Sequence, residues 1–110
     1  MKIIDERCLD RFRGEGCCEW CGQFVQRREP HHFFYKRGMS GGSRLDVPEN
    51  LIALCATFHG GNCHHRAEAC EIKKEQLLEI VAKREGKSGQ EIVQYLTELK
   101  WKRKQWTALL

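Results

Sequence analysis

The chain has 110 residues, of which 41% are hydrophobic and 31% are charged, and its formal net charge at pH 7 is +4. This length suits one domain, and the composition excludes both a membrane-embedded chain and a disordered chain of low hydrophobicity. No apolar run approaches the roughly 18 residues of a membrane-spanning helix, and the N-terminal residues do not resemble a signal peptide. We therefore expect a single cytoplasmic domain over residues 1–110, with no membrane partner. The positive charge mildly favours a polyanionic partner.

The N-terminal half of the chain predicts one short helix and two strands. The helix is expected within residues 5–16, where Gly14 would end it. Residues 23–28 form a short piece that suits an extended conformation. The aromatic-rich run 30–37 predicts a strand. A glycine-rich loop and a turn then lead to the apolar run 51–55, which we interpret as the partner strand.

The C-terminal half predicts helices. From about His64 the apolar spacing becomes helical, and Gly86 provides a stop signal. Ser88 and Glu91 then match the S-x-x-E capping box at the start of a further helix. The apolar residues expected on one face before the stop are Ile72, Leu77, Ile80 and Val81, and those after it are Ile92, Tyr95, Leu96, Leu99 and Trp106. This order of helix, two strands and helices predicts an α+β fold.

The chain holds seven cysteines, and this odd number without a secretory signal argues against a disulfide framework. Cys18 and Cys21 have the spacing of a zinc knuckle, in which two thiolates project from one tight turn and Gly22 permits a left-handed backbone. Cys55 and Cys63 would complete a structural four-cysteine zinc site. Their separation exceeds the usual gap of roughly two to four residues, and buried cysteines without a metal are the alternative interpretation. The remaining cysteines, interpreted as core or free thiols, are Cys8, Cys17 and Cys70.

A second set of polar residues lies between the two cysteine pairs and just after them. His31 and His32 are neighbours on the expected strand, and Asn50 directly precedes the partner strand. His64 stands at the expected helix start, and Glu68 follows one helical turn later on the same face. Histidine and carboxylate ligands on one helix face suit a divalent cation.

The run from residue 18 to residue 68 resembles the HNH endonuclease family of ββα-metal nucleases. The elements that carry the resemblance are, in order, C-E-W-C-G at 18–22, E-P-H-H at 29–32, K-R at 36–37 with S-G-G at 40–42, D-V-P-E-N-L-I-A-L-C at 46–55 and C-H-H-R-A-E at 63–68. Their order and spacing match that family over about half of the chain, and agreement with structural context adds weight to a motif. The nearest likeness is to the small stand-alone HNH proteins that are common in phages and mobile elements.

The resemblance implies a metal-dependent DNA endonuclease that leaves a 5′ phosphate and a 3′ hydroxyl. It maps the general base onto His32. It maps the ligands of a catalytic Mg²⁺, Mn²⁺ or Ni²⁺ ion onto His31 and His64, with Glu68 at the position of a further ligand. The middle residue of the motif, which orients the base or its loop, corresponds to Asn50.

The chain departs from the family pattern at one place. Phe58 stands where a second cysteine is usual, and His59 stands where the metal-binding histidine is usual. One register therefore makes His59 the catalytic ligand, or a replacement for one zinc-binding thiolate. The other register slides the motif to Cys63–His64. We prefer the second register, because it keeps the Cys-His dipeptide together with the helix that follows it.

The resemblance places a zinc-held ββα-metal core at residues 18–70 and a C-terminal helical extension at residues 71–110. Expected partners are DNA, a second copy of the chain in a homodimer and, as context from phage relatives, a DNA-packaging complex. A rival hypothesis is a non-catalytic zinc-ribbon module that binds nucleic acid, which leaves His31, His32 and Asn50 at nuclease spacing unexplained. A third is a nuclease for RNA or for branched or damaged DNA, because it would use the same metal and base.

Overall fold

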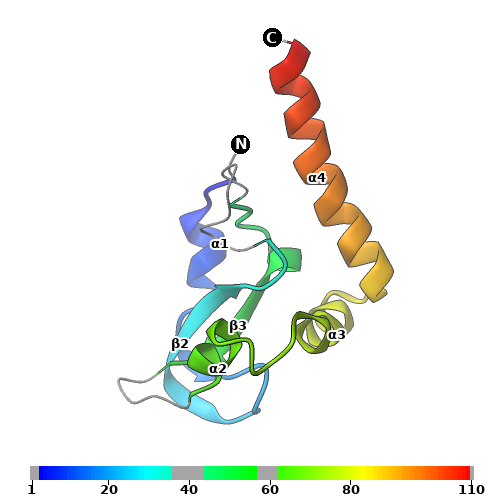
Figure 1. Cartoon of the computed structure of the whole chain (residues 1–110). Helices are drawn as coiled ribbons and strands as arrows, with labels where there is room; N and C mark the ends of the chain where they lie inside the picture. The colour runs from blue at the N-terminus through cyan, green and yellow to red at the C-terminus, as the bar shows by residue number, and fades with distance from the viewer. Residues whose placement is uncertain (1–2, 36–43, 57–61, 110) are drawn as a thin grey trace.

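The structure, a computed structural model of the chain, describes residues 3–35, 44–56 and 62–109, and only the backbone of residues 101–109. Its elements are, in chain order, helix α1 (Glu6–Asp10), strands β1 (Gly14–Cys17) and β2 (Phe24–His32), 3-10 helix η1 (Pro48–Asn50), strand β3 (Leu51–Cys55) and helices α2 (Cys63–Glu68), α3 (Lys74–Glu85) and α4 (Gly89–Leu109) (Figure 1). The predicted α+β class is confirmed. Within the described ranges, no helix combines the length and the apolar character needed to cross a membrane.

The strands form one antiparallel sheet in the order β1-β2-β3. The expectation of only two strands is therefore wrong, since residues 14–17 pair with β2. The pairing register shifts between Gly14 and Gly16, as at a β-bulge. Glycines have low strand propensity, so the local sequence indicates a helix stop here. Pairing with β2, a tertiary effect, makes this segment a strand.

β2 is one nine-residue strand where the sequence predicted two separate pieces. It ends at His32, short of the end of the predicted run 30–37, whose last two residues lie outside the described part of the chain. Beyond His32 the backbone N–H groups of Phe34 and Tyr35 donate to Oδ1 of Asn50, at 3.2 and 2.9 Å. This side chain replaces a neighbouring strand as their hydrogen-bond partner, and the strand therefore ends.

β3 matches the predicted partner strand at residues 51–55, which confirms that prediction. Its residues alternate between two hydrophobic clusters, as the two faces of a strand require. Ile52 and Leu54 belong to a larger cluster with residues of α2, α3 and α4, whereas Leu51 and Ala53 belong to a smaller cluster with residues of α1 and the segment after it. The sheet is thus covered by α1 on one face and by α2 and α3 on the other.

The helical pattern expected from about His64 is interrupted. α2 ends at Glu68, Cys70 has a left-handed backbone with φ of +61°, and α3 begins only at Lys74. Ile72, expected on a helix face, lies between the two helices and is still only 3% exposed. The periodicity does not reveal the break, because this isoleucine is buried in either conformation.

The predicted boundary between the last two helices is confirmed. Gly86 ends α3 in the left-handed conformation, with φ of +68°. At the start of α4 the Ser88 hydroxyl accepts from the N–H of Glu91, and the Glu91 carboxylate accepts from the N–H of Ser88, both at 3.1 Å. This is the reciprocal pair of the capping box.

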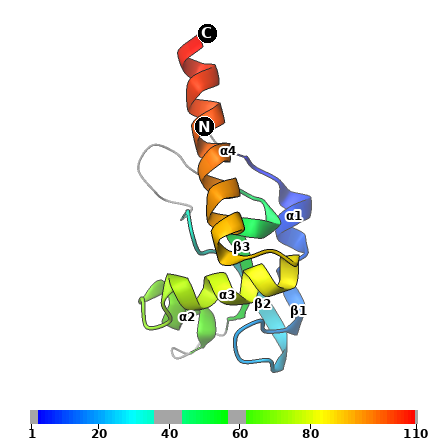
Figure 2. The same ribbon diagram turned by 90° about the vertical axis from the view of Figure 1, so that its right-hand side faces the viewer.

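Part of the predicted apolar face of α4 is buried. Ile92 and Leu96 are fully buried, and Leu99 is half-buried. Tyr95 was expected on the same face, but it is 37% exposed, and the side chain of Trp106 lies outside the described residues. Both views show the C-terminal part of α4 projecting beyond the other elements (Figures 1 and 2), whereas the helix contacts α3 and η1.

Candidate metal centres and active site

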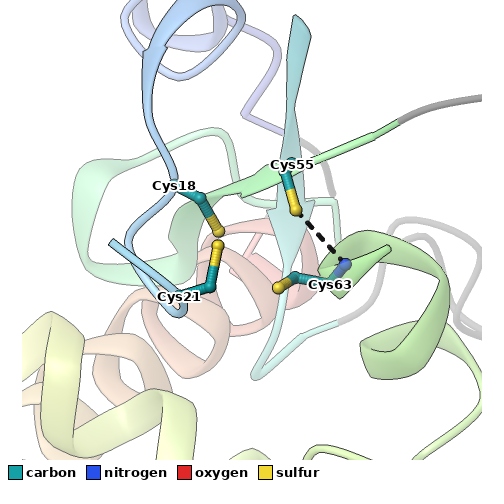
Figure 3. Close-up of side chains that lie close together, drawn as sticks. All are labelled: Cys18, Cys21, Cys55 and Cys63. Atoms are coloured by element: carbon teal, nitrogen blue, oxygen red, sulfur yellow. Dashed lines mark hydrogen bonds between the residues drawn. The ribbon is translucent and has the colours of Figure 1, made fainter. Parts of the chain in front are cut away.

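Four of the seven cysteines gather at one point. The sulfur atoms of Cys18, Cys21, Cys55 and Cys63 all lie within 4.8 Å of one another, which confirms the predicted group at metal-binding distance. The side chains point toward one another from the turn after β1, the end of β3 and the start of α2 (Figure 3). The long gap between the second pair is no obstacle, because the N–H of Cys63 donates to the sulfur of Cys55 at 3.4 Å.

The turn that holds the first cysteine pair has hydrogen bonds of its own. The N–H of Cys18 donates to the carbonyl of Gln23, and the N–H of Gly22 donates to the carbonyl of Cys18, both at 2.9 Å. Gly22 has a φ of +77°, so the left-handed backbone predicted at this glycine is confirmed. The backbone itself therefore directs the sulfurs of Cys18 and Cys21 to the same side.

Burial and proximity oppose the accumulation of negative charge in this four-cysteine group. Burial would raise the pKa of Cys18, but backbone N–H groups that donate to its sulfur lower this pKa below its ordinary value. Burial and the neighbouring cysteines raise the pKa of Cys63, and burial and the charge of Cys18 raise that of Cys21. One thiolate thus opposes ionisation of the others, and a cation among them removes this opposition.

The donor set fits a tetrahedral, thiophilic ion. A zinc ion with Zn–S distances of about 2.3 Å holds its sulfurs roughly 3.8 Å apart, which agrees with four sulfurs lying within 4.8 Å of one another. Four thiolates leave no position open for a substrate, so a metal in this group serves the fold and not the chemistry.

His31, His64 and Glu68 form a second group, in which one ligand atom of each residue lies within 4.8 Å of the others. Nδ1 of His31 and Nε2 of His64 lie 3.2 and 3.7 Å from the same carboxylate oxygen of Glu68. His31 is 4% exposed, whereas the side chain of Glu68 is 54% exposed, so the group faces solvent on the side of α2. These are the three residues of the register through Cys63–His64, while His59, the alternative ligand, lies outside the described residues.

The chemistry of this second group differs from that of the cysteines. Two imidazole nitrogens and one carboxylate oxygen suit divalent cations such as Mn²⁺, Ni²⁺ or Mg²⁺. Three protein ligands leave coordination positions for water and for oxygens of a bound molecule. This group can therefore hold a metal that takes part in chemistry.

His31 and His32 lie on opposite faces of the sheet. His31 pairs with Ile52, which belongs to the cluster beneath α2 and α3, and His32 pairs with Leu51, which belongs to the α1 cluster. Cross-strand partners share a face, so the two histidines point in opposite directions. Because they are the last two residues of β2, a ligand that contacts both has to lie across the end of that strand.

His32 belongs to a buried polar network. Its Nε2 lies 2.7 Å from Oδ1 of Asp46, whose side chain is fully buried. The Arg44 guanidinium donates to both carboxylate oxygens of Asp46, at 2.9 to 3.2 Å, and the N–H of Asp5 donates to one of them at 2.9 Å. Burial would raise the pKa of Asp46, but the hydrogen bonds from Arg44 and His32 hold it below its ordinary value.

This network determines which nitrogen of His32 can accept a proton. An ionised carboxylate accepts hydrogen bonds and cannot donate them, so Nε2 of His32 carries the hydrogen that Asp46 accepts. Nδ1 is then the lone-pair nitrogen of the neutral ring.

Sequence reasoning did not give Asp46 a role in the site, and it did not foresee the buried ion pair of Arg44 with Asp46. It treated Asp46 only as the first residue of a turn, because an aspartate before a proline-containing turn is common without any function. The available signal was an acidic residue inside the 46–55 segment that carries the family resemblance. Its contact with His32 depends on how the chain returns from β2 to η1, which local pattern does not specify.

The side chain of Asn50 forms hydrogen bonds with the segment that follows β2 and with the segment that precedes η1. Its Oδ1 accepts from the backbone of Phe34 and Tyr35, and its Nδ2 donates to the carbonyls of Tyr35 and Leu45, both at 3.0 Å. The side chain is fully buried. All of its hydrogen bonds go to backbone, so Asn50 fixes the path of the chain next to His32 and does not itself contact the metal-ligand group.

Comparison of the chain with known protein families, with curated proteins and with solved structures found no match. The residues of the chain and their geometry are therefore what bears on its function.

Replacing Cys63 with serine is expected to remove the metal from the four-cysteine group, because a serine hydroxyl is a poor ligand for zinc compared with a thiolate. Native mass spectrometry should show one tightly bound zinc ion per wild-type chain and none in Cys63→Ser, with a lower Tm for the variant. Cys17→Ser is the matched control, since Cys17 is exposed and outside the group. Equal zinc content in the two variants would contradict zinc binding by the four-cysteine group.

Replacing Asn50 with alanine is expected to lower the free energy of unfolding by about 2–4 kcal/mol, because four buried or partly buried backbone groups lose their hydrogen bonds to this side chain. Denaturant unfolding in zinc-saturated buffer measures this change. Gln94→Ala is the control, since Gln94 is an exposed amide whose side chain donates to Glu98, one turn further along α4. If both variants unfolded at the same denaturant midpoint as wild type, the hydrogen bonds of the Asn50 side chain would not stabilise the fold.

Proposed function

We propose that this protein is a metal-dependent endonuclease of the HNH type that hydrolyses phosphodiester bonds of DNA. One observation carries the proposal: a closed four-sulfur group and an open group of two nitrogens and one oxygen meet at the start of α2, through the adjacent residues Cys63 and His64. The closed group suits a structural zinc ion, and the open group suits a catalytic Mg²⁺, Mn²⁺ or Ni²⁺ ion. The motifs of the sequence follow the order of the HNH family.

The open group is built to present a cation to a substrate from solvent. A divalent ion there would act as a Lewis acid on the scissile phosphate and stabilise the leaving 3′ oxygen. His31 is held rigidly by its burial at the end of β2, while His64 and Glu68 project from one face of α2. The exposed carboxylate of Glu68 leaves the approach from solvent open.

His32 is the general base in this proposal. Its Nε2–H donates to Asp46, so Nδ1 is the nitrogen that takes the proton from the attacking water. Arg44 fixes the carboxylate of Asp46, and the carboxylate in turn fixes the plane of the imidazole ring. Since His31 and His32 face opposite sides of the sheet, the scissile phosphate and the water lie across the end of β2.

His32→Ala is expected to lose metal-dependent nicking of supercoiled plasmid by roughly 10²- to 10⁴-fold, because the water loses its proton acceptor. Zinc-loaded wild type and variant are compared with Mg²⁺, Mn²⁺, Ni²⁺ or no added divalent cation. His65→Ala is the matched control, since His65 is an exposed histidine on α2 outside the metal-ligand group, and it should keep wild-type activity.

Two results would count against this proposal. Equal nicking by His32→Ala and wild type would remove His32 as the base. DNA binding by wild type without cleavage under any of the metals would favour the zinc-ribbon binding module instead.

Asp46→Asn is expected to lower kcat by roughly 10- to 100-fold with little change in KM, because an amide no longer fixes the tautomer and plane of His32. Steady-state nicking kinetics below the Tm of the variant give both constants. Glu49→Gln is the control, since Glu49 is a buried carboxylate in the same segment that pairs with Lys87 instead of His32. A kcat loss of the same size in both variants would mean that general destabilisation, and not the contact with His32, causes it.

A further inference from the structure

A cavity of about 370 Å³ adjoins the group of His31, His64 and Glu68, because His31 lines both. Its walls come from the end of β2 and the residues just after it, from α2, and from the start of α3 with the segment that leads into it. The volume lies near the lower end of the roughly 300–1,000 Å³ found for small-molecule sites, and it is large enough for a single nucleobase with its sugar.

We propose that this cavity binds one unpaired nucleobase of the DNA substrate, in the nucleotide next to the scissile phosphate. The inference rests on the proposed function, since the metal-ligand group defines where that phosphate lies. A nucleotide whose phosphate is held beside His31 has its sugar and base within reach of the same wall. The base then enters the cavity while the phosphate stays at the metal-ligand group.

The interior of the cavity suits the flat, largely apolar faces of a base. Phe33, Ile72 and Leu77 line it and are each at most 3% exposed, so they form an apolar floor that is held rigidly by the core. Phe34 also lines it, is only half-buried and offers an aromatic ring. Stacking on an aromatic side chain is the common way in which proteins bind single unpaired bases without reading their sequence.

The rim of the cavity carries charges that match a nucleotide. Lys73 and Lys74 line it and are both exposed, and the ammonium of Lys74 lies 4.5 Å from the centre of the Phe34 ring. Two lysines at the entrance favour the phosphates that flank a bound base. Glu75, the acidic residue of this lining, is exposed on α3 beside these lysines.

The proposal narrows the substrate class. A base can enter the cavity only after it leaves the stack, and this costs least where the base is mismatched, bulged or single-stranded. Of the substrates raised by the sequence, DNA with an unpaired nucleotide beside the cleavage point is therefore preferred over fully paired DNA.

The test is a binding measurement that needs no cleavage. Three labelled DNAs of one sequence are titrated with zinc-loaded protein without added divalent cation, and fluorescence anisotropy reports binding. The first DNA is fully paired, the second has one unpaired nucleotide, and the third has an abasic site at that position. We expect the second DNA to bind roughly 10-fold more tightly than the other two, because stacking of the base is the difference.

A pair of variants locates the contact. Phe34→Leu keeps an apolar side chain but removes the aromatic face, and it should abolish the preference for the unpaired base. Phe24→Leu is the matched control, since Phe24 is a phenylalanine that is 65% exposed on β2 and does not line the cavity. It should keep the preference. The abasic DNA tests the same contact from the side of the DNA and does not depend on whether a variant folds.

The outcomes separate this inference from the proposed function. Equal binding of the three DNAs, tight binding of the abasic DNA, or an unchanged preference in Phe34→Leu would overturn base binding in the cavity, even if plasmid is nicked. Tighter binding of the DNA with the unpaired base, without nicking under any metal, would support base binding in the cavity and overturn the proposed nuclease activity.

Discussion

The four-cysteine group is the constraint on which the geometry of the proposed active site depends. α2 has only six residues, too few for a helix that is stable without tertiary contacts. Its first residue is Cys63, whose sulfur lies among those of three cysteines from other parts of the chain. The next residue, His64, and the later Glu68 are then aimed at His31. Because the thiolates oppose one another without a cation, a metal bound to this group would hold in place the helix that carries two of the three residues of the open group. The positions of the two groups therefore depend on each other, because Cys63 of the closed group and His64 of the open group are adjacent residues.

The end of β2 is where three hydrogen-bonding and ligand networks meet. Alternation along a strand sends His31 to the face of α2 and His32 to the face that holds Asp46, so neighbouring residues acquire different chemistry. In the interior of a sheet these two side chains would be separated by the strand itself. At the last two positions of β2 a bound molecule can contact both. Asn50 determines where the strand ends, because it takes the backbone N–H groups that a neighbouring strand would otherwise bind. In the proposed function, Asn50, which is not a metal ligand itself, thus determines whether the metal ligands and the general base can contact one substrate.

The sequence predicted the parts of this molecule that local chemistry specifies. The apolar run of β3 and the reciprocal capping pair of Ser88 and Glu91 carry their own signals, as does the spacing of the first cysteine pair. The parts that were missed depend on distant segments. β1 contains two glycines and is extended only because β2 pairs with it, and the break at Cys70 leaves the burial pattern unchanged. The contact of Asp46 with His32 arises from the path between β2 and η1. The alternation of His31 and His32 needs no distant segment, since it follows from the geometry of any strand.

In the proposed function, the arrangement of the cavity explains how such a protein could select a site on DNA without reading a sequence. The apolar floor and the Phe34 ring contact the faces of a base, which are similar for all four bases. Lys73 and Lys74 contact phosphates, which carry no sequence information. The remaining difference between one site and another is the free energy needed to take a base out of the stack, and that cost belongs to the DNA. A duplex position with a mismatch or a bulge therefore places its phosphate at the metal-ligand group more often than a paired position does. Selectivity for structural defects then follows from the shape of the cavity and from its shared wall with His31.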